Sequence, residues 1–281
     1  MSQNDSAASD LAPGAVLQVL GTRRMGRAYE FFSTCTSTND VARSRAAAGA
    51  AEGLAIVADS QTAGRGRLGR SWHSPPGQNL YLSLLLRPAL PARQAAPLTL
   101  LAGAALARAL TEAGATPRLR WPNDLLVPAA GEFRKAAGIL TEMATDGEQV
   151  RHIVLGVGLN VNGQEFPPDL AERATSLRMA LGRAFDRVRL LVDFLAAFEA
   201  TYDDFLTRGP ASGLVQWRRY ADLGRVCRID RDGARVEGIA TDIDDDGALL
   251  VRDDAGRVHR MISGEEVVVQ LVAEVWPRRR V

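Results

Sequence analysis

The sequence predicts an α+β fold, a mixed sheet covered by helices, followed by a small all-β barrel. Three observations support this fold class. Strand and helix patterns are mixed along residues 27–222. The two strongest helical patterns, 94–114 and 189–206, flank a long hairpin pattern at 136–161. From Gly224 onward short β segments are divided by Asp and Gly turns, which is typical of a barrel of about 50 residues.

The composition excludes several classes of protein. The chain has 281 residues, of which 46% are hydrophobic and 24% charged, as in folded globular domains. Its net charge of +1 gives no general reason to expect binding to nucleic acid or to a membrane surface. No apolar run reaches the ~18 residues that a membrane span needs. Cys35 and Cys227 lie far apart, as expected for free thiols in the cytoplasm, and the scattered histidines show no metal-ligand spacing.

The first expected elements lie before residue 90. Residues 27–34 alternate and carry aromatic side chains, so a strand is expected there. The Ser-Thr pair at 37–38 can cap an Ala-rich helix that ends near Gly49. Residues 53–60 and 79–88 are apolar and predict two further strands.

The middle of the chain predicts a helix followed by a hairpin. Residues 94–114 have long helical periodicity and stop at a glycine. Short extended pieces are expected at 118–121 and 125–127. Residues 136–161 form a hairpin that turns at Asp146-Gly147, the strongest short hairpin signal in the chain.

The last helices and the two ends complete the organisation. Residues 189–206 form an amphipathic helix, and 213–223 form the last one. The all-β module spans 223–275, and 276–281 are a basic tail. Residues 1–26 begin with small, polar and acidic residues, unlike a signal peptide, and are expected to be a disordered tail.

The stretch QTAGRGRLGRSW, residues 61–72, contains the pattern G-x-G-x-x-G. A dinucleotide-binding fingerprint would need a helix directly after it, whose N-terminus holds the pyrophosphate. Here RSWHSPPGQ and a further strand follow instead, and the acidic residue about 20 positions on is missing. The Rossmann interpretation is therefore rejected.

The same stretch predicts a loop that binds anions. Its glycines let backbone N–H groups approach a ligand closely. Arg65, Arg67 and Arg70 supply guanidinium groups that match carboxylate or phosphate oxygens. Gln61 and Trp72 flank the loop. A solvated basic loop is the alternative, and we favour anion binding because further polar segments accompany the loop.

These companions are short polar motifs at the ends of expected strands and helices. They are STND (37–40), RWPND (120–124), KAAGIL (135–140) and GVGLNV (156–161). In RWPND the proline fixes an extended corner that projects Asn123 and Asp124. Each motif alone is more often a turn than a site, but four of them beside an arginine loop predict one binding site.

Residues 22–272 resemble the biotin protein ligases (biotin–[acetyl-CoA-carboxylase] ligases). The GRGR loop before a buried strand is the most specific match, and the four other motifs follow in the family's order. The resemblance implies a catalytic domain at 27–222 related to class II aminoacyl-tRNA synthetases, and an SH3-like barrel after it. Fewer residues precede the first strand than an N-terminal DNA-binding domain needs, so the monofunctional type is expected. The chain departs from many members at Arg120, where they have lysine, and at Leu68.

The implied activity is an ATP-dependent ligation. Biotin would be activated as biotinyl-5′-AMP and transferred to a lysine of a biotin carboxyl carrier protein, such as that of acetyl-CoA carboxylase. ATP and biotin are the expected substrates, and Mg²⁺ would neutralise the triphosphate. Neither DNA nor a membrane is an expected partner, and the expected location is the cytoplasm. Two alternatives remain open: a lipoate or octanoyl ligase or transferase of the same fold, and a non-catalytic biotin or nucleotide sensor.

The resemblance also implies roles for individual residues. The expected biotin contacts are Ser37, Thr38, Asn39, Gln61, Gly64, Arg65, Gly66, Arg67 and Lys135. The expected contacts with ATP or the adenylate are Arg65, Arg67, Arg70, Trp72, Asn123 and Asn160. Lys135, Arg67 and Asp124 are the catalytic candidates, and no metal ligand is assigned.

Two of these candidates carry a physical argument of their own. Lys135 is the only lysine among 34 basic residues, which sets it apart from the arginines that fill every other basic position. An acceptor lysine has an ordinary pKa of ~10.4, so a neighbouring group must favour its neutral form. Asp124 is the candidate for that task, and the alternative is that it caps the turn of the RWPND motif.

Overall fold

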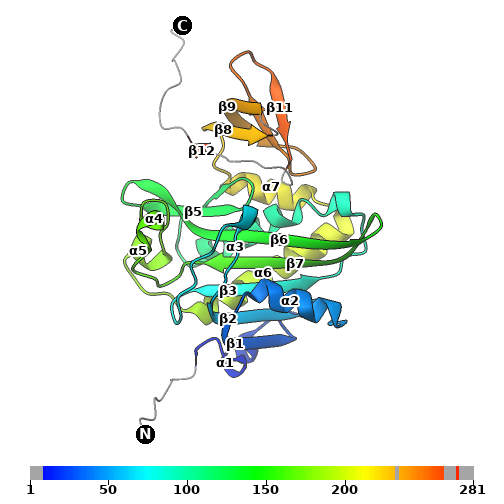
Figure 1. The fold of residues 1–281 in the computed structure, drawn as a ribbon, viewed down its shortest axis with the longest axis vertical. Helices are drawn as coiled ribbons and strands as arrows, with labels where there is room; N and C mark the ends of the chain where they lie inside the picture. The colour runs from blue at the N-terminus through cyan, green and yellow to red at the C-terminus, as the bar shows by residue number, and fades with distance from the viewer. Residues whose placement is uncertain (1–8, 232–233, 263–269, 272–281) are drawn as a thin grey trace.

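A mixed seven-stranded sheet forms the centre of the computed structural model, which describes residues 9–231, 234–262 and 270–271 (Figure 1). The strand order is β1-β2-β3-β7-β6-β5-β4. β1 and β2 are parallel, and every other neighbouring pair in this sheet is antiparallel. The strands are β1 (Tyr29–Cys35), β2 (Ala55–Gln61), β3 (Leu80–Leu86), β4 (Arg118–Arg120), β5 (Asp124–Ala129), β6 (Glu132–Asp146) and β7 (Gln149–Leu159).

Helices cover both faces of this sheet. The long helices α3 (Leu98–Glu112), α6 (Arg187–Arg208) and α7 (Ala211–Tyr220) pack against one another on one face. The opposite face carries α2 (Thr38–Ala47), whose Ala42 and Ala46 pack on Ile56 of β2 and Leu85 of β3. Alternate residues of β2, Ala55 and Val57, belong to the larger core under the long helices. Successive side chains of β2 therefore point alternately into two hydrophobic cores, one on each face of the sheet.

The expected hairpin at 136–161 is the β6–β7 pair. Its two-residue connection is Gly147-Glu148, one position later than expected. The helices expected at 94–114, 189–206 and 213–223 correspond to α3, α6 and α7. Sequence patterns missed the short helices α4 (Pro168–Ala171) and α5 (Leu177–Leu181), which lie between β7 and α6. Helices of one turn carry too little periodicity to be recognised.

The prediction of a disordered tail over 1–26 is wrong for residues 9–26, here called the N-terminal segment. This segment contains helix α1 (Pro13–Val19) and buries Leu11, Val16 and Met25 completely. It is fixed to the domain because Glu199 of α6 accepts backbone hydrogen bonds from Arg23, Arg24 and Met25, at 2.8, 2.7 and 3.0 Å. Residues 1–8 lie outside the described residues.

A second, antiparallel sheet follows the last helix and confirms the small all-β module. Its order is β11-β10-β9-β8-β12. The strands are β8 (Val226–Arg231), β9 (Ala234–Ile243), β10 (Leu249–Arg252), β11 (Val258–Met261) and β12 (Gln270–Leu271). It contacts the first domain where the Trp121 indole donates to the carbonyl of Gly247 at 3.0 Å, and where Arg218 pairs with Asp242 at 2.7 Å. The expected basic tail, 276–281, lies outside the described residues.

Candidate active site

The N-terminus of α2 is the buried end of the site. Ser37, Thr38 and Asn39 are all buried there. The first backbone N–H of the helix, that of Thr38, donates to Gln61 Oε1 at 2.8 Å, so Gln61 of β2 takes the place of a capping side chain on Ser37. The Ser83 hydroxyl lies 2.8 Å from Thr38 Oγ1 and 2.6 Å from Asn39 Oδ1. These polar groups therefore form one hydrogen-bonded cluster, fixed by β2 and β3.

The arginine loop, residues 62–79 between β2 and β3, folds back on itself beside this cluster. The Trp72 N–H donates to the Gly64 carbonyl at 2.8 Å, and Gly66 donates to Arg70 at 2.7 Å. A Cβ atom at position 64 would lie 2.6 Å from the Trp72 carbonyl oxygen, so this crossing requires glycine. Only one 3₁₀ turn, Arg67–Gly69, follows Gly64 and Gly66, which agrees with rejecting a dinucleotide fingerprint.

Arg65 is held by two carboxylates. Its Nη2 atom lies 2.6 Å from Glu142 Oε2 on β6 and 3.1 Å from Asp40 Oδ1 on α2. Asn39 Nδ2 donates to the same Glu142 oxygen at 2.6 Å. The Arg65 side chain is 34% exposed. The loop is thus joined to β6 through Glu142 and to α2 through Asp40, and Glu142 also connects β6 to Asn39 of α2.

Trp72 lies on a flat shelf made by two glycines. Gly138 of β6 and Gly158 of β7 are partners across the β6–β7 ladder. A Cβ atom at Gly158 would come within 2.5 Å of the Trp72 ring, so any side chain there would displace the indole. The Trp72 Nε1 atom is buried and makes no hydrogen bond to the described residues. A glycine inside a strand marks such a close approach.

The RWPND corner brings the second group of charges to the same place. Lys135 Nζ lies 2.6 Å from Asp124 Oδ1 and 5.5 Å from the centre of the Trp72 ring. Arg67 Nη1 donates to Asn123 Oδ1 at 3.5 Å, and Asn123 Nδ2 donates to the Ile139 carbonyl at 2.9 Å. Burial lowers the pKa of Arg67, and the nearby charge of Asp124 opposes that shift.

Asn160 and Arg70 occupy the edges of the site. Asn160 is buried, and its Nδ2 donates to the Thr175 carbonyl at 3.1 Å. It connects to the lysine segment because its N–H donates to the Ala136 carbonyl at 2.8 Å. Arg70, by contrast, is exposed at the tip of the arginine loop.

The structure therefore brings most of the candidate residues into one hydrogen-bonded region. The residues joined by hydrogen bonds, ion pairs, ring contacts or the geometry of the arginine loop are Thr38, Asn39, Gln61, Gly64, Arg65, Gly66, Arg67, Trp72, Asn123, Asp124 and Lys135. Ser37 directly precedes α2, Asn160 directly follows β7, and Arg70 is exposed on the arginine loop. What each residue contacts in a ligand stays a prediction.

Three features of the site were missed by sequence reasoning. Ser83 lies inside an apolar strand, and Glu142 lies in a strand that ends in solvent, so neither belongs to a recognisable motif. The glycine shelf did leave a signal. Gly158 of the shelf follows Gly156 in a G-x-G pattern, and residues two apart in a strand face the same side of the sheet.

The arrangement suits the binding and activation of anions. Two guanidinium groups and one ammonium group converge with the N-terminus of a helix and several amide donors, and such groups stabilise carboxylate and phosphate charge. Arg65 and Arg67 lie on the arginine loop and Lys135 lies on β6, and contacts with Glu142, Asn123 and Asp124 fix their positions. Cations held in advance around one point are what a reaction between two anions requires.

Comparison with known families agrees with this chemistry. The model of the biotin/lipoate A/B protein ligase family matches residues 31–160, and the biotin protein ligase C terminal domain matches residues 222–269. The chain is 39% identical to a bifunctional ligase/repressor of Bacillus subtilis, over 84% of this chain and 73% of that protein. It is 34% identical to a biotin–[acetyl-CoA-carboxylase] ligase of Mycobacterium tuberculosis, over 89% of this chain and 92% of that protein.

Solved structures agree as well. The chain superposes on a biotin protein ligase from Aquifex aeolicus in complex with biotin and ATP, with a TM-score of 0.75 and 27% identity. That match covers 88% of this chain and 100% of the other. The α+β domain and the small C-terminal sheet are both included in these similarities. The chain belongs to the biotin protein ligase family.

Proposed function

We propose how this ligase carries out the ATP-dependent biotinylation of a carrier protein. In the first step the biotin carboxylate attacks the α-phosphorus of ATP, which forms biotinyl-5′-AMP and releases pyrophosphate. In the second step an acceptor lysine amine attacks the acyl carbon and releases AMP. Because the first step joins two anions, the protein must supply fixed positive charge in a place shielded from water.

Lys135, Arg65 and Arg67 are proposed to supply that charge. Lys135 faces Asp124, and Arg65 faces Glu142, with each of these side chains between 26% and 34% exposed. Ion pairs at such exposure contribute only about 0–1 kcal/mol. A ligand carboxylate or phosphate can therefore replace or join the protein carboxylate at small cost.

The buried cluster at the start of α2 is proposed to bind the ring of biotin. Ser37, Thr38, Asn39 and Gln61 offer hydroxyl and amide groups that can pair with a polar ring. Gly64 and Gly66 let the arginine loop close over the carboxylate. Since Ser83 and Glu142 orient this cluster, the biotin end is held by β3 and β6 as well as by α2.

The nucleotide is proposed to lie along the other side of the arginine loop. Asn123, directly before β5, and Asn160, directly after β7, offer amide groups, and Trp72 offers an aromatic face. Arg70 at the loop tip is placed to meet the outer phosphates. The contact that supports this assignment is the hydrogen bond from Arg67 to Asn123, which joins the loop to the RWPND corner.

Asp124 is proposed to prepare the acceptor lysine. Its carboxylate lies beside Lys135 at the centre of the charged group. When Lys135 turns to the adenylate, Asp124 is available to take a proton from the incoming ammonium group as a general base, which leaves the amine neutral. The amine then attacks the acyl carbon.

Mg²⁺ is proposed to arrive with ATP. Within the described part of the chain, no group of three or more His, Cys, Asp or Glu side chains could hold a metal ion by itself. Mg²⁺ commonly binds through substrate phosphates with only one or two carboxylates. The residues present fit that mode, in which the phosphates supply the main ligands and the metal screens their charge.

The proposed acceptor is a biotin carboxyl carrier protein, the class implied by the names of relatives such as the Mycobacterium tuberculosis enzyme. We propose no sequence-specific DNA binding, which the net charge of +1 supports. None of the helices in residues 9–231 and 234–262 is long and apolar enough to cross a bilayer. Free Cys35 and Cys227 support the proposed cytoplasmic location.

The observation that carries the proposal is that the arginine loop contacts both polar groups: Arg65 shares Glu142 with Asn39 of α2, and Arg67 contacts Asn123 of the RWPND corner, where Lys135 pairs with Asp124. ATP–pyrophosphate exchange by the purified chain tests it directly. We expect exchange that depends on biotin and is not supported by lipoate. Exchange with lipoate at equal efficiency, or none with biotin, would contradict the proposal. Transfer of label from biotin to a carrier domain tests the second step.

A further inference from the structure

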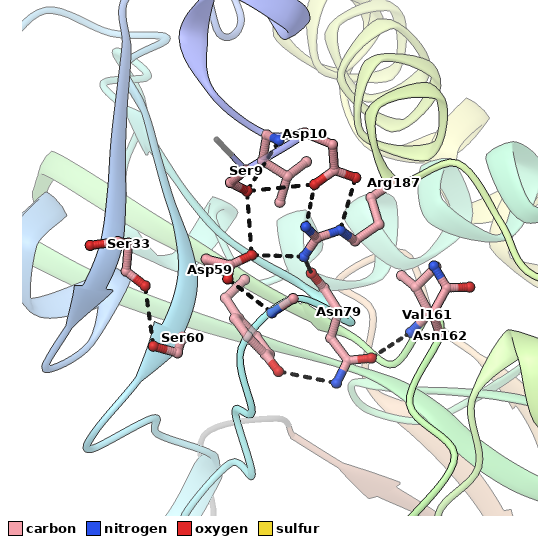
Figure 2. Close-up of polar contacts among 12 residues, drawn as sticks. Ser9, Asp10, Ser33, Asp59, Ser60, Asn79, Val161, Asn162 and Arg187 are labelled. Atoms are coloured by element: carbon pink, nitrogen blue, oxygen red, sulfur yellow. Dashed lines mark hydrogen bonds and ion pairs between the residues drawn. The ribbon is translucent and has the colours of Figure 1, made fainter. Parts of the chain in front are cut away.

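A buried arginine outside the proposed ligand contacts ties the N-terminal segment to the arginine loop (Figure 2). Arg187 is the first residue of α6, and its side chain is only 6% exposed. Its guanidinium donates twice to Asp10, with Nε 3.1 Å from Oδ2, and once to Asp59 Oδ1 at 2.9 Å. A cation is unfavourable at the positive end of a helix. Stability of α6 therefore does not explain why an arginine stands there.

The same guanidinium fixes the return limb of the arginine loop. Arg187 Nη1 donates to the carbonyl of Asn79, the last loop residue, at 3.1 Å. Asp59 Oδ2 accepts the N–H of Gly77 at 2.9 Å. Arg187 thus holds the loop directly through Asn79 and indirectly by orienting Asp59.

Asn79 carries this link to the segment that contains Asn160. The Asn79 side chain accepts the N–H of Val161 at 2.8 Å and donates to the Tyr81 hydroxyl at 3.1 Å. The Tyr81 hydroxyl in turn donates to the carbonyl of Pro75 in the loop at 3.0 Å. One buried side chain, Asn79, therefore joins the two segments that carry the proposed nucleotide contacts.

We propose that Arg187, together with Asp59 and Asp10, positions the adenylate site: the network holds the arginine loop and the Asn160 segment in the arrangement that retains biotinyl-5′-AMP. The inference rests on the proposed function and deepens it. Arg187 contacts the base of the loop rather than Arg65 or Arg67, so it acts through the loop and not on the reacting atoms. The N-terminal segment contributes a working part of the site through Asp10.

The expected effect follows from the population of the binding-competent loop. If weakening the network lowers that population, the apparent affinity for ligand falls by the same fraction. Chemistry in the correctly arranged molecules is unchanged. We expect KM for biotin and ATP, and the rate at which biotinyl-5′-AMP escapes, to rise roughly 3- to 30-fold, with a smaller change in kcat.

The test uses three network variants of the full chain and one matched control. Asp59→Asn removes the carboxylate that bridges Arg187 and Gly77, Asp10→Asn weakens the outer pair, and Arg187→Lys keeps the charge but loses the fork. Asp193→Asn makes the same chemical change on α6, where Asp193 pairs with the exposed Arg189. The measurements are KM and kcat in ATP–pyrophosphate exchange, and release of labelled biotinyl-5′-AMP from the preformed complex.

We expect the largest rise in KM and release rate for Asp59→Asn, a smaller one for Asp10→Asn, and wild-type values for Asp193→Asn. Arg187→Lys should keep part of the function. Thermal melts define a temperature at which each variant is folded. If a buried variant does not fold, Asp10→Asn carries the test, because the Asp10 side chain is 47% exposed.

The two failures are distinguishable. If the network variants lose stability or active fraction but keep wild-type KM and release rates, the network is only structural and the inference is wrong. If wild type and Asp193→Asn show no biotin-dependent exchange, the proposed function itself is wrong.

Discussion

Arg187 and Arg65 each face two carboxylates, but the two sets of ion pairs lie in different surroundings. Arg187 is 6% exposed at the start of a long helix, and its partners belong to the N-terminal segment and to β2. Arg65 is 34% exposed on a glycine-rich loop, and its partners belong to α2 and β6. The same pairing of an arginine with two carboxylates therefore occurs once with a buried arginine at the start of α6 and once with a partly exposed arginine on the arginine loop.

The difference teaches that burial decides what an ion pair is able to do. Removing one partner of a buried pair leaves an uncompensated charge and typically costs about 3–5 kcal/mol. An exposed pair is worth about 0–1 kcal/mol, because water replaces the lost partner. The Arg187 pairs therefore fix a geometry, and the Arg65 pairs can exchange one anion for another.

Lys135 gives the largest expected effect. It tests the partly exposed ion pairs, in which a ligand anion can replace the protein carboxylate. Its pair with Asp124 has exposures of 34% and 26%, so it belongs with Arg65. We expect Lys135→Arg to lower adenylate formation by about 100-fold, since a wide planar guanidinium would displace the reacting groups by ~1 Å. Single-turnover formation of biotinyl-5′-AMP measures this effect. Lys135→Ala should be at least as slow while the melting temperature stays near wild type. Near-wild-type adenylation by Lys135→Arg would remove the role assigned to Lys135.

The direct comparison of the two arginines is expected to separate stability from activity. Arg187→Ala should lower the free energy of unfolding by about 3–5 kcal/mol, because the Asp59 carboxylate, which is only 17% exposed, loses its cationic partner. Arg65→Ala should lower it by less than about 1 kcal/mol and still impair adenylation. Urea unfolding of the two variants, followed by circular dichroism, gives both values. Equal losses of stability in the two variants would show that burial does not separate the two arginines.

Glu199 is a second buried charged group that, like Arg187, lies on α6 and holds the N-terminal segment. Burial by itself would raise the pKa of Glu199, but hydrogen bonds from the N–H groups of Arg23, Met25 and Arg24 lower it below its ordinary value of 4.5. Because the folded-state pKa is depressed, the stabilisation is complete above pH 4.5 and is lost as the pH falls through the folded value.

Glu199→Gln is therefore expected to cost about 1–3 kcal/mol at neutral pH and to flatten the acid limb of the stability curve. The measurement is the free energy of unfolding at several pH values between 3 and 7. An acid limb as steep in the variant as in wild type would show that other carboxylates cause it. Replacing Asp203, which pairs with Arg23 and the partly exposed Arg24, serves as a control and should have a smaller effect.

Arg120 is the intermediate case and gives the smallest expected effect. It is 27% exposed and lies 3.6 Å from Asp222, which is 5% exposed and also pairs with Arg118 and Arg225. Arg120→Lys keeps the charge, and Asp222 keeps two other arginines. We expect adenylation within about twofold of wild type and a melting temperature within about 2 °C. A loss as large as that of Lys135→Arg would place Arg120 among the reacting groups.

Most of the fold could be predicted because strong periodic patterns define β2, β3, α3 and the β6–β7 hairpin. The N-terminal segment was missed for a physical reason. Its buried residues Leu11, Val16 and Met25 lie in a segment too short to show a clear period, and helix α1 contacts α6, which is far away in the sequence. Local sequence contains no sign of a contact with Glu199, which is 174 residues from Met25.

Part of the candidate site could be predicted from the sequence, and part of it could not. Residues within motifs, such as Gln61 and Lys135, were identified because each motif lies at the end of a strand or helix. Glu142 could not be identified, because an acidic residue on a half-exposed strand looks like any surface residue. Its importance comes from meeting Asn39 and Arg65, which approach it from two other elements. Three-dimensional convergence of this kind leaves no local pattern.

The contact between Asp10 and Arg187 also has a consequence for the order of folding during synthesis. The two residues are 177 positions apart in the chain. At translation rates of about 5–20 residues per second, Asp10 would leave the ribosome on the order of 10–35 s before its partner. Contacts of such high sequence separation form late, because the intervening loop must be closed first. The N-terminal segment is synthesised early but is therefore expected to be among the last parts of the chain to form its native contacts. The end of the arginine loop that Arg187 holds is expected to become ordered at the same stage.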